Sequence, residues 1–370
     1  MSKIRIFVDG HWFDQLYEST GVFIRGLYSR LAKDDDFEIL MGAFYPDRLR
    51  NAFDQTDRIQ YIQYQSKSKY YRLAYNIPAI VKRHRIDIAH FQYTSPLFKR
   101  CAEIVTIHDI LFKDFPGEFP WSYRITKDIL FRRSARRADL VTTVSTYSRD
   151  AIARHYGIQK SSIEVVPNGV GSEFFDVSSS ALVQEKFGLD KYILYISRFE
   201  PRKNHYRLLQ AYLQTELWNE NIYLVLVGRV DIPVDDFDSL LNSLPSEMRR
   251  FIVRFEKIAF PDLLALYKNA SLCVYASMAE GFGIPPLESA AMRTKTLCSN
   301  QTAMRDFDFF GEDLFDPYDV NGLAAKIKSK LRKDDWAQRD YISNSIRLRF
   351  SWDDIAAAFG EKIKSICKKS

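Results

Sequence analysis

The sequence predicts an α/β protein that consists of two series of parallel strands, each strand followed by a helix. Short apolar runs bounded by turn residues, which favour buried strands, alternate along the chain with apolar residues at helical spacing. A small polar stretch, Val177–Ser180, separates the first series from the second. The 370 residues, of which 46% are hydrophobic and 27% charged, suffice for two folded domains. Strands that alternate with helices form parallel sheets covered on both faces.

The first series begins at the strand candidate Ile4–Asp9, and Val22–Lys33 follows as a helix with its apolar residues on one face. The further strand candidates of this series are Phe37–Phe44, Ile59–Tyr64, Asp87–Gln92, Glu103–Ile107, Asp139–Val144 and Ile163–Val166. The helix candidates between them include Tyr70–His84, Trp121–Arg137 and Ser148–Tyr156.

The second series follows the turn Pro167–Val170. Its strand candidates are Tyr192–Ile196, Ile222–Val227, Phe251–Phe255, Leu272–Ala276 and Thr296–Ser299, with helices between them. The last stretch, Trp352–Cys367, has apolar residues at helical spacing and predicts a C-terminal helix.

Composition favours a cytoplasmic protein. The longest uncharged stretch of the most apolar region, Asn269–Ala279, is too short to span a bilayer. Met1 to Arg5 leads directly into the first strand candidate, and we expect no signal peptide. The four cysteines have neither metal nor redox spacing, which favours reduced thiols. They are Cys101, Cys273, Cys298 and Cys367.

The positive charge lies in the first half of the chain. Residues 1–175 contain 26 Lys and Arg against 20 Asp and Glu, whereas the remainder is balanced. The excess is concentrated in residues 67–100 and 124–137. One interpretation is an anionic partner, such as a membrane surface or a lipid-diphosphate acceptor, and the other is a solvated basic face. We expect no nucleic-acid partner, because zinc-finger spacing and RNA-binding aromatic motifs are absent.

The stretch from Glu280 to Glu288 has the pattern of a strand, a glycine loop and a helix N-terminus. Gly281 and Gly283 permit a sharp turn that lets a ligand approach the backbone, and two prolines suit the first helical turn. Free N–H groups there attract a phosphate, whereas the two carboxylates suit the hydroxyls of a sugar or a ribose. The structural alternative is a turn with a helix-stabilising glutamate.

A basic loop, Ser197–Asn204, follows the first strand of the second series, at a carboxyl strand end where a diphosphate binds. Arg198 and Lys203 there can stabilise a leaving nucleoside diphosphate, and the alternative is a basic loop that caps a helix. The acidic runs Asp34–Asp36 and Asp235–Asp238 are expected in solvated loops, and we expect no metal site.

The Glu280–Glu288 stretch resembles the signature of glycosyltransferase family 4, in which two glutamates are separated by seven residues. This resemblance implies that Glu280 contacts the donor sugar and Glu288 the nucleotide ribose. The loop and helix residues implied in nucleotide-sugar binding are Gly281, Phe282, Gly283, Ile284 and Leu287. The resemblance also implies that Arg198 and Lys203 hold the donor phosphates, with Arg202 able to replace either.

Further segments extend the resemblance over most of residues 86–330. In Thr106–Ile110, His108 is implied to face the donor from the acceptor side, with Asp109 orienting it; taken alone, His108 is an ordinary surface histidine. Gly21 resembles the glycine loop near the donor diphosphate, although the usual double glycine is absent. The other matches are Ala138–Ser145, Val165–Val170, Leu226–Gly228 with Gly228, and the base-binding region Phe255–Phe260 with Ile258.

The resemblance implies the GT-B fold, with two Rossmann-like domains that face each other across a cleft. Residues 1–175 are the expected acceptor domain and residues 186–350 the expected nucleotide-sugar donor domain. Helix 351–370 is expected to pack back on the first domain. No cofactor is expected beyond a GDP-sugar or UDP-sugar as co-substrate.

The implied function is retaining transfer of a sugar to a hydroxyl of a glycan or lipid-linked acceptor in surface polysaccharide synthesis. The segments His90–Tyr93, His108–Asp109 and Phe115–Phe119 look most like the bacterial mannosyltransferase-like branch, which favours GDP-mannose. Expected locations are the cytoplasm or the inner face of the plasma membrane. The alternatives are a sugar-nucleotide epimerase or a phosphorylase of the same fold, and an inactive glycan-binding subunit.

Overall fold

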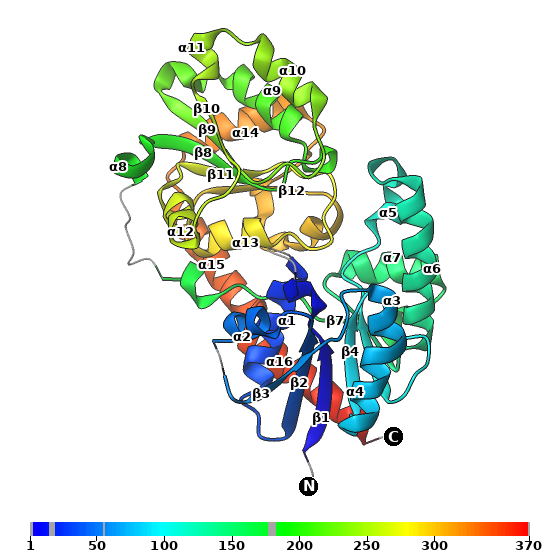
Figure 1. Ribbon diagram of the computed structural model, residues 1–370. Coiled ribbons are helices and arrows are strands. Elements are labelled where there is room, and N and C mark those ends of the chain that lie inside the picture. Colours follow the sequence, from blue (N-terminus) through cyan, green and yellow to red (C-terminus); the bar gives the residue numbers. More distant parts are fainter. Residues whose placement is uncertain (1–2, 15–18, 55, 177–182, 369–370) are drawn as a thin grey trace. The chain divides into compact units, whose positions relative to one another are not determined.

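The computed structural model describes residues 3–14, 19–54, 56–176 and 183–368. The chain divides into two compact units (Figure 1). Unit 1 comprises residues 1–169 and 350–370, and unit 2 comprises residues 170–349. The connecting stretch expected at Val177–Ser180 lies outside the described residues.

In its described part, unit 1 contains one sheet of seven parallel strands in the order β3-β2-β1-β4-β5-β6-β7. The order reverses between β1 and β4, and ligands of such sheets bind at the carboxyl strand ends beside this reversal. The strands are β1 (Ile4–Asp9), β2 (Phe37–Ala43), β3 (Ile59–Gln63), β4 (Ile88–Gln92), β5 (Ala102–Thr106), β6 (Leu140–Thr143) and β7 (Ile163–Val165).

Helices cover both faces of this sheet. They are α1 (Ser19–Leu31), α2 (Pro46–Ala52), α3 (Lys69–Tyr71), α4 (Ile77–Arg83), α5 (Leu111–Asp114), α6 (Trp121–Arg137), α7 (Thr146–Tyr156) and α16 (Trp352–Cys367). The expected single helix Tyr70–His84 is interrupted by a π-helical segment, Arg72–Asn76, between α3 and α4. No helix within the described ranges is long and apolar enough to cross a membrane.

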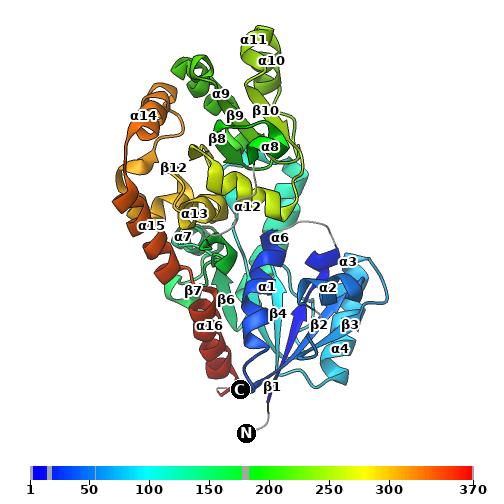
Figure 2. The same ribbon diagram turned by 90° about the vertical axis from the view of Figure 1, so that its left-hand side faces the viewer.

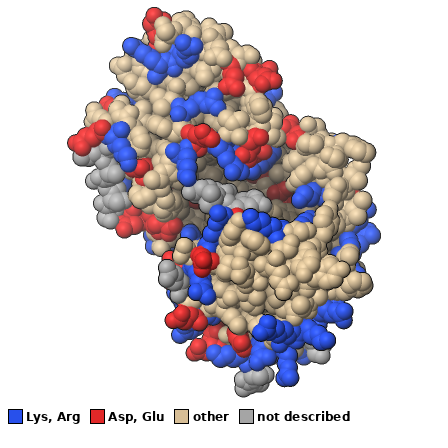
Figure 3. Space-filling view, viewed as in Figure 1, with Lys and Arg blue, Asp and Glu red and all other residues tan. Residues whose placement is uncertain are grey.

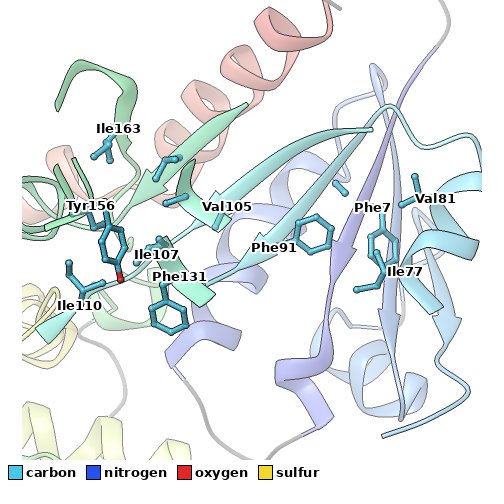
Figure 4. Close-up of a cluster of buried hydrophobic side chains, with 14 of the residues drawn as sticks. Phe7, Ile77, Val81, Phe91, Val105, Ile107, Ile110, Phe131, Tyr156 and Ile163 are labelled. Atoms are coloured by element: carbon cyan, nitrogen blue, oxygen red, sulfur yellow. The ribbon is translucent and has the colours of Figure 1, made fainter. Parts of the chain in front are cut away.

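Successive residues of β4 face opposite layers, because side chains alternate along a strand. Phe91 belongs to a buried cluster with Ile77 of α4, Phe131 of α6 and Tyr156 of α7 (Figure 4). His90 points the other way, and its ring lies 5.4 Å from that of Phe359 in α16. Continuous burial of all five β4 residues fits a strand covered on both sides.

Unit 2 repeats this plan with a parallel sheet in the order β10-β9-β8-β11-β12-β13, counted over its described residues. Here the reversal lies between β8 and β11. The strands are β8 (Lys191–Ile196), β9 (Ile222–Val227), β10 (Ile252–Phe255), β11 (Leu272–Tyr275), β12 (Thr296–Ser299) and β13 (Leu314–Phe315). The helices are α8 (Val183–Phe187), α9 (His205–Thr215), α10 (Asp235–Ser243), α11 (Ser246–Arg249), α12 (Phe260–Asn269), α13 (Ile284–Ala291), α14 (Val320–Arg332) and α15 (Trp336–Arg349).

In unit 2, two elements differ from the sequence prediction. The two-residue strand β13 is too short to give a periodic signal. The acidic run Asp235–Asp238 forms the first turn of α10 rather than a loop. Carboxylates there interact favourably with the positive end of the helix dipole.

The expected packing of the C-terminal helix on the first domain is confirmed. Helix α16 lies against α1 (Figure 2), where the Trp352 ring lies 6.3 Å from that of Phe23. Gly169 and Gly26 make room for the indole. A Cβ on Gly169 would lie 2.6 Å from the Trp352 ring, and one on Gly26 would overlap it. Lys364 of α16 adds ion pairs with Asp34 and Asp36.

We expect Gly26→Ala to lower the free energy of unfolding by about 1–3 kcal/mol, because the new methyl group overpacks the Trp352 site. This loss should exceed the gain from the better helix propensity of alanine. Urea unfolding followed by circular dichroism measures the change. Gly117→Ala is the matched control, since its Cβ would have no neighbour within 4 Å. Equal midpoints for the two variants would contradict the packing argument.

Candidate active site

The loops that carry the predicted chemistry of unit 2 both leave the strands at the sheet reversal. The loop after β8 forms a short 3-10 turn, Pro201–Lys203, and the loop after β11 leads through Gly283 into α13. Asn204 connects them: its side-chain amide donates to the carbonyls of Ala276 (3.0 Å) and Pro317 (2.8 Å). Asn204 has a left-handed backbone (φ 61°), which asparagine tolerates better than most residues.

A largely buried ion cluster joins these two loops. Lys203 Nζ lies 2.5 Å from Glu280 Oε1, and Arg202 Nη1 lies 3.3 Å from Glu280 Oε2. Arg202 also contacts Glu200 at 2.6 Å. The side chains are 10–16% exposed, so each charge needs a partner in place of the water it has lost.

The cluster keeps Glu280 ionised. Burial by itself raises the pKa of this carboxyl, but the charges of Lys203 and Arg202 outweigh burial and lower the pKa to about 2. Burial lowers the pKa of Lys203, and the neighbouring Arg202 acts in the same direction. Glu280 opposes that change. The ionised Glu280 side chain therefore only accepts hydrogen bonds.

Arg198 makes no ion pair with Glu280 in the described structure and is more exposed than Lys203. Its side chain is 49% exposed, and its Nη1 lies 2.6 Å from Asp231 Oδ2. Arg229 contacts the other oxygen of Asp231 at 2.6 Å. The structure thus brings Lys203 and Glu280 together and places Arg202 beside them. Arg198 is more exposed and lies between two carboxylates, Asp231 and Glu200, with its Nη2 3.5 Å from Glu200 Oε1.

Two of the predicted glycines are required by the backbone. Gly283 has φ 99°, and a Cβ there would lie 2.8 Å from Met304 Cγ. Gly228 has φ 152°, and a Cβ there would collide with the Ser197 carbonyl, because the loops after β8 and β9 touch. Gly21 is different: it lies in the first turn of α1, and a Cβ would be no closer than 3.6 Å to Phe13.

The other predicted residues of unit 2 lie along the same edge of its sheet. Ile258 lies in the loop after β10, and Phe282 packs edge-on to Phe307 at 5.7 Å. Leu287 of α13 is fully buried, so its side chain belongs to the core. Gly281 is buried and Ile284 half-buried in the turn that starts α13.

Glu288, also in α13, differs from Glu280 in its charge state. Burial raises its pKa to about 7, although the Tyr267 hydroxyl, which donates to Oε2 at 2.8 Å, lowers it. Glu173 adds to the rise by repulsion. The side chain therefore exchanges a proton near neutral pH.

In unit 1, His108 follows β5 and is buried rather than a surface histidine. Its Nε2 bonds Gln92 Oε1 at 2.7 Å, while Asp109 accepts from the Leu111 N–H. Burial lowers the pKa of His108 to about 3, so the ring is neutral. A hydrogen-bond chain continues from Gln92 to His90 at 3.2 Å.

Sequence reasoning missed a charged pair at the carboxyl end of β1. Asp9 is 1% exposed; its Oδ2 lies 3.3 Å from Arg72 Nε, and its Oδ1 accepts from the Tyr64 hydroxyl at 2.9 Å. Burial raises the pKa of Asp9, but His11 and Arg72 outweigh it and hold the pKa well below its ordinary value. An Asp that ends a buried strand and precedes a glycine is the signal that was available.

Sequence comparison shows the family of the chain. A model described as Glycosyltransferase Family 4 matches residues 20–174, and one described as Glycosyl transferases group 1 matches residues 182–349. The chain belongs to glycosyltransferase family 4. The Lys203–Glu280 pair and the glycine loop lie within the second match, and His108 lies within the first.

Two bacterial mannosyltransferases are similar to this chain at low sequence identity. The O-antigen chain mannosyltransferase RfbU of Salmonella typhimurium is 26% identical over 269 residues, which cover 72% of this chain and 70% of the relative. The O-antigen chain mannosyltransferase B of Escherichia coli is 28% identical over 257 residues, covering 68% and 67% of the two chains.

Solved structures confirm the GT-B fold of this family 4 chain. A glycosyltransferase from Rickettsia africae has a TM-score of 0.76 at 19% identity, with full coverage of both chains. Anabaena Alr3699/HepE in complex with UDP-glucose has a TM-score of 0.73 at 17% identity, covering 98% of this chain and 99% of the other.

We expect Lys203→Met to lower the free energy of unfolding by about 3 kcal/mol at pH 7, because one partner of a buried pair is left with its charge. The pKa of Glu280 is lowered from 4.5 to about 2 in the folded state. The stabilisation that this shift represents is present above 4.5 and is lost as the pH falls through 2. The deficit of the variant should therefore shrink in acid.

Urea unfolding at about pH 7 and about pH 3 measures this deficit. Lys191→Met is the control, because it changes an exposed lysine of the adjacent strand β8. A deficit that is the same at both pH values would show that Lys203 does not stabilise the ionised Glu280.

Proposed function

We propose that this glycosyltransferase is a retaining enzyme that transfers mannose from GDP-mannose to a hydroxyl of a glycan or lipid-linked acceptor in surface polysaccharide synthesis. The observation that carries the proposal is the Lys203–Glu280 pair at the carboxyl ends of the two strands that flank the sheet reversal. A carboxylate for sugar hydroxyls and a cation for a departing diphosphate meet there.

A nucleotide-sugar donor has support from several directions. Helix α13 presents its N-terminus after the Gly283 turn, where free N–H groups favour a phosphate. HepE, which shares the fold, was solved with UDP-glucose. Both sequence relatives are named as mannosyltransferases of O-antigen chains, which favours a mannosyl donor and a polysaccharide acceptor.

We assign retention to attack on the face that the diphosphate leaves, rather than to inversion or to a double displacement through Glu280. An inverting enzyme needs a general base at the acceptor hydroxyl, and the neutral His108 is too weak a base. A double displacement needs a carboxylate that attacks the anomeric carbon. The pKa of Glu280 is lowered to about 2 by Lys203 and Arg202, so it is a weak nucleophile already engaged by two cations. We therefore assign it to sugar hydroxyls. The leaving phosphate takes the proton of the acceptor hydroxyl, and the acceptor enters on the same face.

Unit 1 is assigned to the acceptor. At the carboxyl ends of β1, β4 and β5, the rings of Trp12 and Tyr93 lie 6.0 Å apart and those of Tyr93 and His108 5.3 Å apart. Partly exposed aromatic faces of this kind suit the apolar faces of sugars. The neutral His108 can exchange a hydrogen bond with a sugar hydroxyl, and it is too weak a base to hold a proton.

The test is release of nucleoside diphosphate from a panel of GDP- and UDP-sugars, followed by NMR of the product. We expect GDP release from GDP-mannose and an α-linked product from this α-linked donor. A β-linked product would overturn the retaining assignment. Conversion of the free nucleotide-sugar to an epimer would establish an epimerase, and binding without release would indicate an inactive glycan-binding subunit.

Arg198→Ala is the informative variant in this assay, because its exposed side chain can be removed without breaking the Lys203–Glu280 pair. Loss of one donor to the developing charge should lower turnover by roughly 10²–10³-fold. Arg249→Ala, which changes an exposed arginine of α11, is the control. Equal turnover of both variants would remove Arg198 from the site.

We also expect the affinity for the donor to decrease as the pH is lowered, because Glu288 becomes protonated. Ribose hydroxyls donate to the ionised carboxylate, whose pKa is about 7 in the free protein. Below that value binding must first release a proton. The dissociation constant should rise roughly tenfold per pH unit in acid.

Calorimetry with GDP between about pH 5 and 8 measures this dependence. Phosphate protonation also contributes near pH 6, so Glu288→Gln serves as the reference that retains the phosphate effect alone. Tyr267→Phe should move the inflection upward, since its hydroxyl lowers the pKa of Glu288. Identical profiles for wild type and Glu288→Gln would contradict the assignment of Glu288 to the ribose.

A further inference from the structure

Unit 1 exposes apolar side chains on three segments: α3 with the following π-helical turn, the loop after β4, and α6. Tyr70 is 80% exposed, Phe98 68% and Trp121 72%. We name these residues together the aromatic face. Its members are Tyr70, Tyr71, Tyr75, Leu97, Phe98, Trp121, Tyr123, Ile125 and Ile129.

The three segments adjoin one another. The Arg133 guanidinium of α6 donates to the carbonyls of Pro96 (2.9 Å) and Leu97 (2.6 Å), which holds the loop against α6. A groove lined by Ile77 of α4 and Phe98 joins the loop to the α3–α4 segment. Burial is the main cause of the lowered pKa of Lys69, and repulsion from Lys127 of α6 is the next. Lys69 and Lys127 therefore lie near each other.

The apolar stripe of α6 is not part of the core. Trp121, Ile125 and Ile129 recur every four residues and so share one side of the helix. The buried residues of this helix are Phe131, Ser134 and Ala135, none of which belongs to the stripe. A surface helix ordinarily puts its apolar stripe inward, and an exposed contiguous patch marks an interaction site.

Charge identifies the partner. Residues 67–100 contain eight Lys and Arg against one acidic residue, and residues 124–137 contain six against one. Figure 3 shows an uncharged area over α3 and α4 with Lys and Arg side chains at its borders. Protein interfaces are depleted in lysine at their core. Trp and Tyr beside Lys and Arg are instead the composition found at the interface of an anionic bilayer.

We propose that the aromatic face binds the surface of an anionic membrane. Its rings enter the headgroup region, and the bordering basic side chains lie against the phosphates. Sequence composition left a solvated basic face as an equal alternative, and the exposed rings of the structure decide against it. The proposal goes beyond the transferase reaction: it places the enzyme at the membrane surface, where a lipid-linked acceptor is located.

The test uses vesicles of phosphatidylcholine with and without phosphatidylglycerol, the lipids carrying brominated chains that quench tryptophan. We expect the wild type to co-sediment with the anionic vesicles at low salt and its fluorescence to be quenched. Trp121→Phe should lose this quenching, whereas Trp336→Phe, which changes a 55% exposed tryptophan of unit 2, should keep it. Quenching that depends on Trp336 instead would overturn the proposal.

Two further variants separate charge from apolar contact, and both change exposed positions that should leave the fold intact. Lys82→Glu/Arg83→Glu should lower binding roughly fivefold or more for each residue. Leu97→Ser/Phe98→Ser should bind at low salt but lose the binding that resists high salt. Leu348→Ser in unit 2 is the control, with a side chain 80% exposed.

Absence of anionic vesicle binding by the wild type would overturn the proposal. So would a dimer, measured by light scattering, that forms without vesicles and is lost in Leu97→Ser/Phe98→Ser, because the face would then bind protein. The assay contains neither donor nor acceptor, so its outcome is independent of whether the transferase assignment holds.

Discussion

The buried charge of Glu280 constrains the ligand-facing edge of unit 2. An ionised carboxylate with little water around it is stable only with cations held close. Those cations, Lys203 and Arg202, come from the loop after β8, whereas Glu280 comes from the loop after β11. The two loops must therefore stay together, and Asn204 and Thr302 fix their backbones: Asn204 bonds Ala276, and Thr302 Oγ1 accepts from the Glu280 N–H at 2.8 Å.

The strands, the parallel sheets and the glycine turn could be predicted from the sequence, because local patterns determine them. Continuous apolar runs such as Leu272–Ala276 identify strands buried on both faces, and the alternation of strands with helices identifies parallel sheets. Gly283 was predictable because its backbone conformation excludes other residues. The loop Ser197–Asn204 was predicted at the carboxyl end of a strand, and it does follow β8. The sheet order then places β8 at the reversal.

What could not be predicted depends on tertiary contacts. Three basic residues occur within six positions, and the sequence does not show which of them faces Glu280. The 3-10 turn and the left-handed Asn204 decide it by turning Lys203 and Arg202 inward and leaving Arg198 outside. The Asp9–Arg72 pair likewise joins residues far apart in sequence. Burial of His108 against Gln92 fixes its neutral state in the same long-range way.

The charges of the unit 2 site are divided between two clusters with different properties. The inner one holds Lys203 and Arg202 against Glu280 and Glu200 and is electrically balanced. The outer one holds Arg198 and Arg229 against Asp231, and it adjoins the inner one where Arg198 Nη2 lies 3.5 Å from Glu200 Oε1. Under the proposed function, the exposed Arg198 and Arg229 attract the donor diphosphate with little desolvation cost, since solvent still reaches them. The drier inner cluster keeps Glu280 fixed and ionised, as its proposed contact with sugar hydroxyls requires.

The two glutamates of the glycine loop extend this division to protonation. They are separated by seven residues, yet their pKa values are about 2 and about 7. Buried Glu280 has two cations beside it, whereas Glu288 has the Tyr267 hydroxyl and the like charge of Glu173. Environments that separate two carboxyls in this way assign them different roles. Glu280 stays ionised at neutral pH, whereas Glu288 gains or loses a proton there, so one carboxyl has a fixed charge and the other a charge that depends on pH.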